Sequence, residues 1–257
     1  MNQQIKNRFF LALGISLALA ACNQSDKKDE ETKATDSTGT AKTEEVQPAV
    51  PDAVTAAPNL YKVVADTMGI RMLEVTYKPG DSSALHSHAD YAVYATEGGT
   101  ATFYGKDGAK MESEMKKGTI MVKPGESHSV KNTGKTDLKV ILVEVNRAMG
   151  TMTWDVARDA AKVAGNLYKV AADTLGIRVL EINYKPGQSS SMHSHPDNAL
   201  YVISDGKAEF TDAAGKKNVV ELKKGMMMIG PAETHIVKNI GTTTMKAILV
   251  EVSRPVK

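Results

Sequence analysis

Short segments in which apolar and polar residues alternate are the dominant pattern of this chain. Residues 70–77 place Leu73, Val75 and Tyr77 on one face of an extended segment, and a Lys-Pro-Gly sequence ends it. This pattern predicts a β-strand. Six further strands are predicted between turn residues, at residues 92–96, 100–104, 111–115, 119–122, 127–132 and 138–145. Strands this short and evenly spaced predict an all-β sandwich or jelly-roll barrel, and only residues 153–164 are predicted to be helical, as a brief linker.

The strand pattern occurs twice along the chain. Shifting the sequence by 107 residues aligns residues 59–145 with residues 166–252 without a gap, and 49 of the 87 positions are identical. Duplication accounts for this similarity, so each copy is one structural unit. We therefore predict a first repeat at residues 52–145, a connector at 146–158 and a second repeat at 159–257. A chain of 257 residues with 42% hydrophobic residues is long enough for two separate cores.

The N-terminal residues have the character of a secretion signal. Lys6 and Arg8 precede an apolar run, residues 9–18, that is too short to span a bilayer but fits the apolar region of a signal peptide. The run is followed by Leu-Ala-Ala-Cys, which resembles the lipobox of bacterial lipoproteins, whose cysteine becomes the lipidated first residue. Residues 1–21 are thus predicted to be a lipoprotein signal peptide and Cys22, the only cysteine, the lipidation site. The alternative is a free thiol beside an ordinary cleavage site.

Residues 22–51 are predicted to form a flexible, disordered tether. They are rich in Lys, Asp, Glu, Thr, Ala and Pro and have almost no large apolar side chain that could offset the entropy of ordering. A charged cluster at residues 26–31 resembles the export signal of some Bacteroidetes surface lipoproteins, although a solvated spacer is the simpler interpretation. Asn23 follows Cys22 in place of the aspartate associated with inner-membrane retention. The predicted location is the cell envelope, with a lipid anchor in the outer membrane favoured over the inner one.

The charge of the chain excludes nucleic acid as the expected partner. The formal net charge is +2, and loss of residues 1–21 would remove two basic residues and bring it to 0. A nucleic-acid-binding protein would need a basic patch on a recognisable module. The expected partners are a small anionic molecule and, through the anchor, a membrane.

All six histidines of the chain belong to the repeated pattern. His86 and His88 stand two residues apart, so on an extended strand both side chains leave the same face and can reach one point. Neutral imidazole is a common metal ligand near pH 7. The sequence therefore predicts a three-histidine metal site in each repeat, and a vestigial set that binds no metal is the alternative. The two sets are His86, His88 and His128 in the first repeat and His193, His195 and His235 in the second.

These histidines carry a resemblance to the cupin family. The first cupin motif, a glycine, five residues and His-x-His, is matched at Gly80 and again at Gly187. The second motif is matched by Gly118, Pro124, His128 and Asn132 and by their counterparts 107 residues later. The whole chain resembles a bicupin bacterial lipoprotein. This resemblance implies two tandem cupin jelly-roll barrels, also called double-stranded β-helices, after the signal peptide and tether.

The chain departs from the family's first motif at one ligand position. Ala92 and Ala199 stand where cupins usually have a glutamate ligand, which would leave a coordination position open. If these alanines point inward, strand alternation predicts that Tyr94 and Tyr201, two residues further on, face the cavity as well. Each tyrosine could then hydrogen-bond a metal-bound water or a substrate. Packing in the core is the alternative role.

The second motif is one residue shorter than usual between its proline and its histidine. The tightened loop contains Glu126 in the first repeat and Glu233 in the second. We expect both glutamates at a barrel mouth, as surface turn residues or as groups that assist proton transfer.

Three neutral imidazoles would leave a divalent ion its full positive charge and open positions, which favours an anionic ligand. Fe(II), Zn(II), Mn(II), Ni(II) and Cu(II) all suit such a site. The first hypothesis is a metal-dependent envelope enzyme, of dioxygenase or isomerase type, acting on a small anionic metabolite. The others are a non-catalytic module that binds or senses a ligand or metal, and a vestigial cupin scaffold, because this fold hosts all three. Bicupins often place two barrels like a dimer within one chain, so we expect a monomer with internal pseudo-symmetry, with a homo-oligomer as the alternative.

Overall fold

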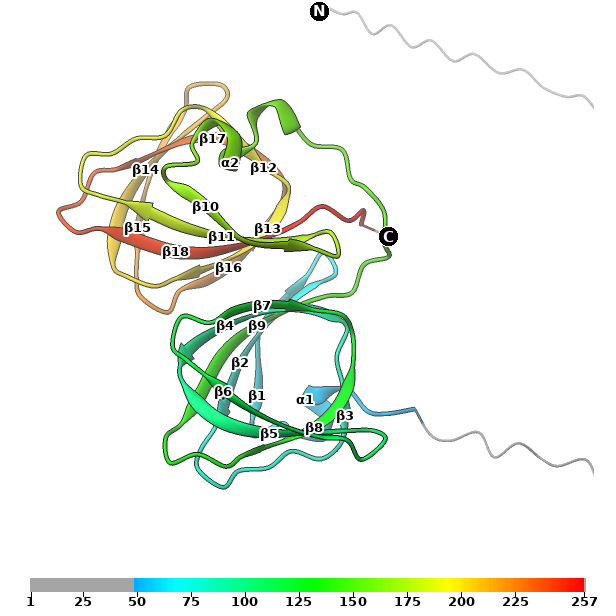
Figure 1. The fold of residues 1–257 in the computed structure, drawn as a ribbon. Coiled ribbons are helices and arrows are strands. Elements are labelled where there is room, and N and C mark those ends of the chain that lie inside the picture. Colours follow the sequence, from blue (N-terminus) through cyan, green and yellow to red (C-terminus); the bar gives the residue numbers. More distant parts are fainter. Residues whose placement is uncertain (1–48, 257) are drawn as a thin grey trace, which may run out of the picture. The chain divides into compact units, whose positions relative to one another are not determined.

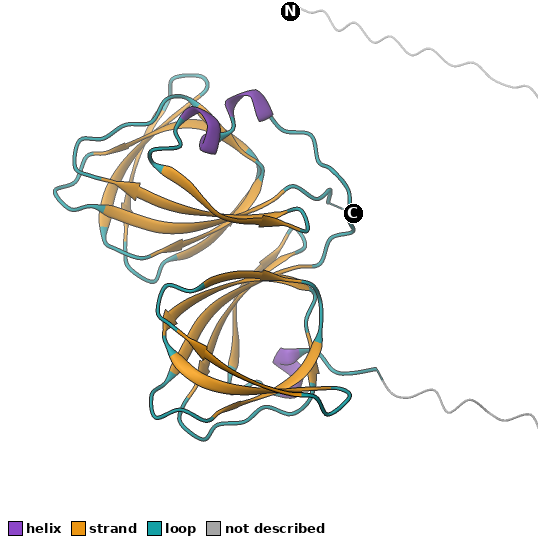
Figure 2. Ribbon diagram, in the orientation of Figure 1, coloured by secondary structure: helices purple, strands orange, loops and turns teal. Residues whose placement is uncertain are grey.

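The computed structural model describes residues 49–256. The predicted signal peptide, Cys22 and most of the predicted tether lie outside these residues. Each repeat forms a barrel of two antiparallel sheets, which confirms the prediction of an all-β jelly-roll protein (Figures 1 and 2). Within the described part of the chain, no helix has the length and apolar character needed to cross a bilayer.

The first repeat contains a five-stranded sheet in the order β1-β2-β9-β4-β7 and a four-stranded sheet in the order β3-β8-β5-β6. A short helix, α1 (Ala53–Ala56), precedes them. The strands are β1 (Tyr61–Thr67), β2 (Ile70–Tyr77), β3 (His86–Ser87), β4 (Asp90–Glu97), β5 (Gly99–Gly105), β6 (Lys110–Met115), β7 (Ile120–Lys123), β8 (Ser127–Asn132) and β9 (Leu138–Val145).

The second repeat has the same topology, with sheet orders β10-β11-β18-β13-β16 and β12-β17-β14-β15. A turn of 3-10 helix, η1 (Val156–Arg158), precedes it, and the repeat begins with α2 (Ala160–Val163). Its strands are β10 (Tyr168–Thr174), β11 (Ile177–Tyr184), β12 (His193–His195), β13 (Asp197–Val202), β14 (Gly206–Asp212), β15 (Lys217–Leu222), β16 (Met227–Gly230), β17 (Glu233–Asn239) and β18 (Met245–Val252).

The seven strands predicted for the first repeat are present. Strand β1 was not predicted from the sequence, and the predicted helical segment has a different structure. The segment predicted as one helix over residues 153–164 is instead η1 and α2, separated by Asp159. Asp159 caps α2 by accepting a hydrogen bond from Ala161 N, as Asp52 caps α1 through Val54 N. Helix α2 is therefore the repeat's own first element and not part of a linker.

The central strands are apolar on both faces because each face packs against a different core. In β2, Leu73, Val75 and Tyr77 point into the barrel. Ile70 and Met72 point the other way, into a cluster shared with Ile177, Val179 and their neighbours from the second repeat. Strand β9 is buried along nearly its whole length for the same reason. One apolar core thus joins the two repeats within residues 49–256.

Two arginines link the repeats reciprocally. Arg147, which follows β9, donates from Nη2 to Asp197 Oδ2 of the second repeat at 2.8 Å and from Nη1 to the Arg254 carbonyl at 2.9 Å. Arg254, which follows β18, donates in the same way to Asp90 Oδ2 at 2.6 Å and to the Arg147 carbonyl at 3.2 Å. Both arginines are buried. Each therefore depends on an aspartate of the other repeat to balance its charge.

Candidate metal centre

Three histidines meet inside each barrel. In the first repeat, His86 on β3, His88 immediately after it and His128 on β8 place ring nitrogens within 4.8 Å of one another. The antiparallel register pairs His86 with His128, which brings residues from distant parts of the sequence together. The second repeat assembles His193, His195 and His235 through the same pairing of β12 with β17. All six side chains are buried.

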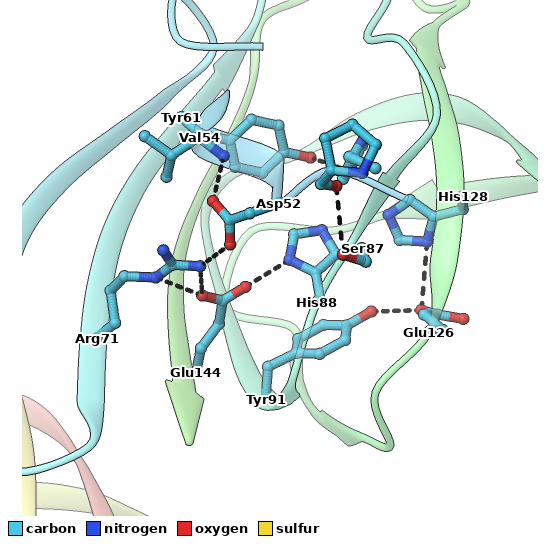
Figure 3. A network of polar contacts seen from close by, with 12 residues as sticks. Asp52, Val54, Tyr61, Arg71, Ser87, His88, Tyr91, Glu126, His128 and Glu144 are labelled. Carbon is cyan, nitrogen blue, oxygen red and sulfur yellow. Dashed lines mark hydrogen bonds and ion pairs between the residues drawn. The ribbon is translucent and has the colours of Figure 1, made fainter. Parts of the chain in front are cut away.

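A buried glutamate orients the second histidine of each set. In the first barrel, Glu144 Oε1 on β9 accepts a hydrogen bond from His88 Nδ1 at 2.6 Å (Figure 3). A proton on Nδ1 leaves the lone pair of Nε2 available for a metal ion, and the hydrogen bond fixes the direction of the ring. In the second barrel, Glu251 Oε1 accepts from His195 Nδ1 at 2.6 Å.

An arginine balances the charge of this glutamate. Arg71 on β2 donates from Nε to Glu144 Oε2 at 2.6 Å, and its guanidinium also binds Asp52, the residue that caps α1 (Figure 3). The second repeat has the same contacts, from Arg178 Nε to Glu251 Oε2 at 2.5 Å and from Arg178 Nη1 to Asp159 Oδ2 at 2.8 Å. A chain of ionic contacts thus connects the start of each repeat to its histidines.

The first histidine of each set shows how the two barrels differ. Both His86 and His193 direct Nδ1 at a backbone carbonyl, at 2.8 Å and 2.9 Å. His86 Nε2 also lies 3.0 Å from the hydroxyl of Tyr61. His193 Nε2 is buried and has no hydrogen-bond partner among the described residues. An unpaired buried nitrogen costs about 1–3 kcal/mol, and a metal ion would supply the missing partner.

Burial favours the neutral form of His86, His128 and His193. Burial, together with the nearby His86 and His88, lowers the pKa of His128 to about 4. Burial lowers the pKa of His193 to about 3, and it lowers the pKa of His86 as well. A neutral imidazole is the form that binds a metal ion. The donor set and its convergence therefore fit a divalent ion in each barrel, and the orphaned His193 nitrogen is a further reason in the second barrel.

The structure corrects the predicted role of Tyr94 and Tyr201. Their rings pack against each other with centroids 5.6 Å apart, within the apolar cluster shared by the repeats. Ala92 and Ala199 belong to the same cluster and do not face the histidines. The prediction failed because β3 and β4 belong to different sheets, so the alternation that starts at His88 does not continue into β4. The absence of a carboxylate at position 92 therefore does not leave a coordination position open.

The side chains of β4 that do face the first cavity are those of Tyr91 and Val93. Tyr91 donates to Glu126 Oε1 at 2.5 Å, and that oxygen lies 3.4 Å from His128 Nδ1. In the second barrel, Glu233 Oε2 lies 3.1 Å from His235 Nδ1. Both predicted loop glutamates thus lie beside the third histidine of their barrel.

Sequence reasoning missed Glu144, Arg71 and Tyr61. One signal was visible, because Glu144 interrupts an apolar strand and its counterpart Glu251 does so at the same place in the second repeat. A charged residue within a strand buried on both faces needs a partner. The identity of that partner depends on how the strands are ordered in the sheet.

Comparison with known proteins agrees with this geometry. The family model described as the cupin domain matches residues 73–144 and, separately, residues 180–251. The chain belongs to the cupin family. The two matches make it a bicupin, as the repeated motifs predicted. None of the curated protein sequences matches it significantly.

Several solved cupin structures resemble the chain at low sequence identity. Oxalate decarboxylase from Bacillus subtilis, a protein with Mn(II) centres, is 17% identical, with a TM-score of 0.53 over 79% of this chain and 72% of that chain. AerE from Microcystis aeruginosa is 12% identical, with a TM-score of 0.54 over 75% of this chain and 97% of that chain. A cupin 2 conserved barrel domain protein from Leptotrichia buccalis is 15% identical, with a TM-score of 0.46 over 75% of this chain and 88% of that chain. Similarity at these identities concerns the fold.

The histidine pKa values predict how acid affects the metal-free cupin. His128 and His193 have pKa values far below their ordinary value of 6.5, so the unfolded chain binds more protons than the folded one between about pH 4 and 6.5. The unfolding free energy should therefore fall as pH falls through this window. Urea denaturation of the metal-free protein at about pH 7 and about pH 5 would measure the loss. A His128→Asn/His193→Asn variant should lose less stability over the window, and equal losses would contradict the assignment.

Proposed function

We propose that this bicupin is a metal-dependent enzyme of the bacterial envelope, of dioxygenase or isomerase type, that acts on a small anionic metabolite. The observation that supports it most strongly is the orphaned, buried Nε2 of His193 beside two further histidines. His86, His88 and His128 would hold one divalent ion, and His193, His195 and His235 a second. Such an ion supplies positive charge that binds and polarises an anionic substrate.

The protein's own residues would position the ligands and control their protonation. Glu144 and Glu251 hold the second histidine of each set in the tautomer that leaves Nε2 free. Arg71 and Arg178 hold these glutamates in place. Phe103 packs its ring edge against His128, with centroids 5.5 Å apart, and provides an apolar wall that limits access of water.

A substrate screen would test the catalytic part of the proposal. The full-length protein, loaded in turn with Fe(II), Mn(II), Zn(II), Ni(II) or Cu(II), would be incubated in air with a panel of small carboxylates and enolates. We include Mn(II) because the B. subtilis decarboxylase is described with Mn(II) centres. Oxygen uptake or product formation that disappears when all six histidines are replaced by alanine would support an enzyme. Metal binding without turnover across the panel would instead identify a binding module, and failure to bind metal a vestigial scaffold.

The proposed anchor rests on Cys22, which lies outside the described residues. We expect the wild-type protein to incorporate labelled fatty acid and to fractionate with membranes, the outer membrane in particular. A Cys22→Ser variant should do neither, because the rest of the tether is polar. If the variant still carries lipid and partitions with membranes, the lipoprotein assignment is wrong. We also propose a monomer, because the apolar cluster shared by the repeats is of the kind that bicupins form within one chain.

A further inference from the structure

Tyr91, Glu126 and Lys123 form a three-residue bridge beside the third histidine of the first barrel, and Tyr91 and Lys123 line its cavity. Glu126 Oε1 accepts a hydrogen bond from the Tyr91 hydroxyl at 2.5 Å (Figure 3). It accepts a second one from Lys123 Nζ at 2.8 Å. The carboxylate is thus fixed between two long side chains next to His128.

The second barrel keeps the glutamate and has lost both of its partners. Asn198 replaces Tyr91, and its amide donates to the Pro196 carbonyl at 3.0 Å. Gly230 replaces Lys123, and a Cβ built at Gly230 would meet only Asn198 Oδ1, at 3.8 Å. The Glu233 side chain is half exposed. These two replacements remove the bridge while leaving the histidines unchanged.

The sizes of the two cavities also differ. The cavity that contains His88 and His128 has a volume of about 100 Å³. The cavity that contains His195 and His235 has a volume of about 740 Å³. In liquid water each molecule takes up about 30 Å³, so the first cavity has room for a ligand of only a few atoms. The volume of the second cavity lies within the range of roughly 300–1,000 Å³ that is typical of pockets for organic ligands.

The walls of the larger cavity are mainly apolar. They include Leu200, Phe210, Val220, Leu222 and Leu249. Three lysines, Lys216, Lys217 and Lys246, and two carboxylates, Asp212 and Glu233, also line it, so its charged lining is slightly positive. Lys217 is paired with Glu209 at 2.9 Å, so the metal ion would be the main attraction for a negatively charged ligand. The ligand that matches both features has one anionic group for the metal and an apolar body for the walls.

We propose that the C-terminal barrel is the one that admits substrate, and that its substrate is a monocarboxylate with an apolar body. The bridge of Tyr91, Glu126 and Lys123 restricts the N-terminal barrel to ligands of a few atoms. This proposal rests on the proposed metal sites and assigns substrate binding to one of them. It does not depend on which reaction the bound ion supports.

The test uses the full-length protein loaded with Co(II), whose visible absorption reports on the ligands of the ion. His86→Ala/His88→Ala leaves only the C-terminal site, and His193→Ala/His195→Ala leaves only the N-terminal site. Each variant is titrated with formate, which is small, and with phenylacetate, which has an apolar body. Phenylacetate should perturb the C-terminal site with a dissociation constant at least about tenfold lower than that of the N-terminal site, whereas formate should differ less between them.

Exchanging the mouth residues should exchange the selectivity. Tyr91→Asn/Lys123→Gly should strengthen phenylacetate binding at the N-terminal site by about tenfold, and Asn198→Tyr/Gly230→Lys should weaken it at the C-terminal site by a similar factor. Tyr91→Phe is the matched control, because it removes the hydrogen bond but keeps the ring, and should have a smaller effect. If a single-site variant fails to fold, the Asn198→Tyr/Gly230→Lys change in the otherwise wild-type protein gives the same answer, as a loss of the phenylacetate response.

Two results would overturn the proposal. The first is equal phenylacetate affinity at both sites, or exchanges that leave the affinities unchanged. The second is the absence of a spectral response to phenylacetate at either site, which would reject this ligand class. Metal content is measured first, so failure to bind Co(II) at all would count against the metal sites themselves and would be seen separately.

Discussion

Glu144→Gln should weaken metal binding by the N-terminal barrel about 10- to 100-fold, the usual effect of losing the group that orients a histidine ligand. Glutamine can still accept one hydrogen bond from His88 Nδ1, but it carries no charge to balance Arg71, whose side chain is only 14% exposed. Because Arg71 keeps its contact with Asp52, losing this charged hydrogen-bond partner should also cost about 1.5–3 kcal/mol of unfolding free energy. Competitive metal titration and urea denaturation would measure the two effects.

Glu251→Gln provides the matched comparison for this prediction. It makes the same change in the C-terminal barrel, through His195 and Arg178. Each variant should weaken one site and leave the other near its wild-type affinity, because each glutamate contacts a histidine of its own barrel. Unchanged metal affinity in a folded Glu144→Gln protein would show that the carboxylate does not orient His88.

Arg147→Ala should destabilise the protein by about 3–5 kcal/mol, because it leaves Asp197 buried without its cation. It also removes the donor to the Met68 carbonyl, at 2.6 Å, in a turn where Met68 has a φ of 52°. Positive φ is unfavourable for methionine, so this turn depends on outside support. Arg254→Ala should have a similar effect through Asp90 and the Leu175 carbonyl.

Denaturant unfolding of both arginine variants would test this prediction, with Lys139→Ala as the control. Lys139 forms exposed ion pairs with Glu97 and Asp137, which solvent screens, so its removal should leave stability almost unchanged. If Arg147→Ala were as stable as Lys139→Ala, the reciprocal arginine contacts would contribute little to holding the repeats together.

Sequence alternation located the strands well, because each apolar face in this protein has a core to pack against. In β2, for example, the residues predicted to share one face, Leu73, Val75 and Tyr77, all lie in the barrel core. The spacing of His86 and His88 likewise predicted that both side chains reach one point, where they meet His128. These features depend on local geometry, which the order of residues largely determines.

The remainder of the site depends on how distant strands are arranged. The predicted direction of the Tyr94 side chain was wrong because β3 and β4 belong to different sheets. The alternation of inward and outward side chains therefore does not continue from one strand to the other. The contact between Glu144 and His88 follows from the place of β9 in the five-stranded sheet, and no local pattern encodes that order. The difference between the mouths lies in two substitutions, Tyr91 to Asn198 and Lys123 to Gly230, whose effect appears only once Glu126 is seen between them.

The metal content of the purified full-length protein tests the central claim most directly. After loading with a divalent metal and removal of the excess, elemental analysis should find about two equivalents per chain, one for each three-histidine set. His86→Ala/His88→Ala and His193→Ala/His195→Ala should each retain about one, since each barrel supplies all of its own ligands. Wild-type protein that retains no metal, or a single pair of substitutions that abolishes all binding, would contradict the account.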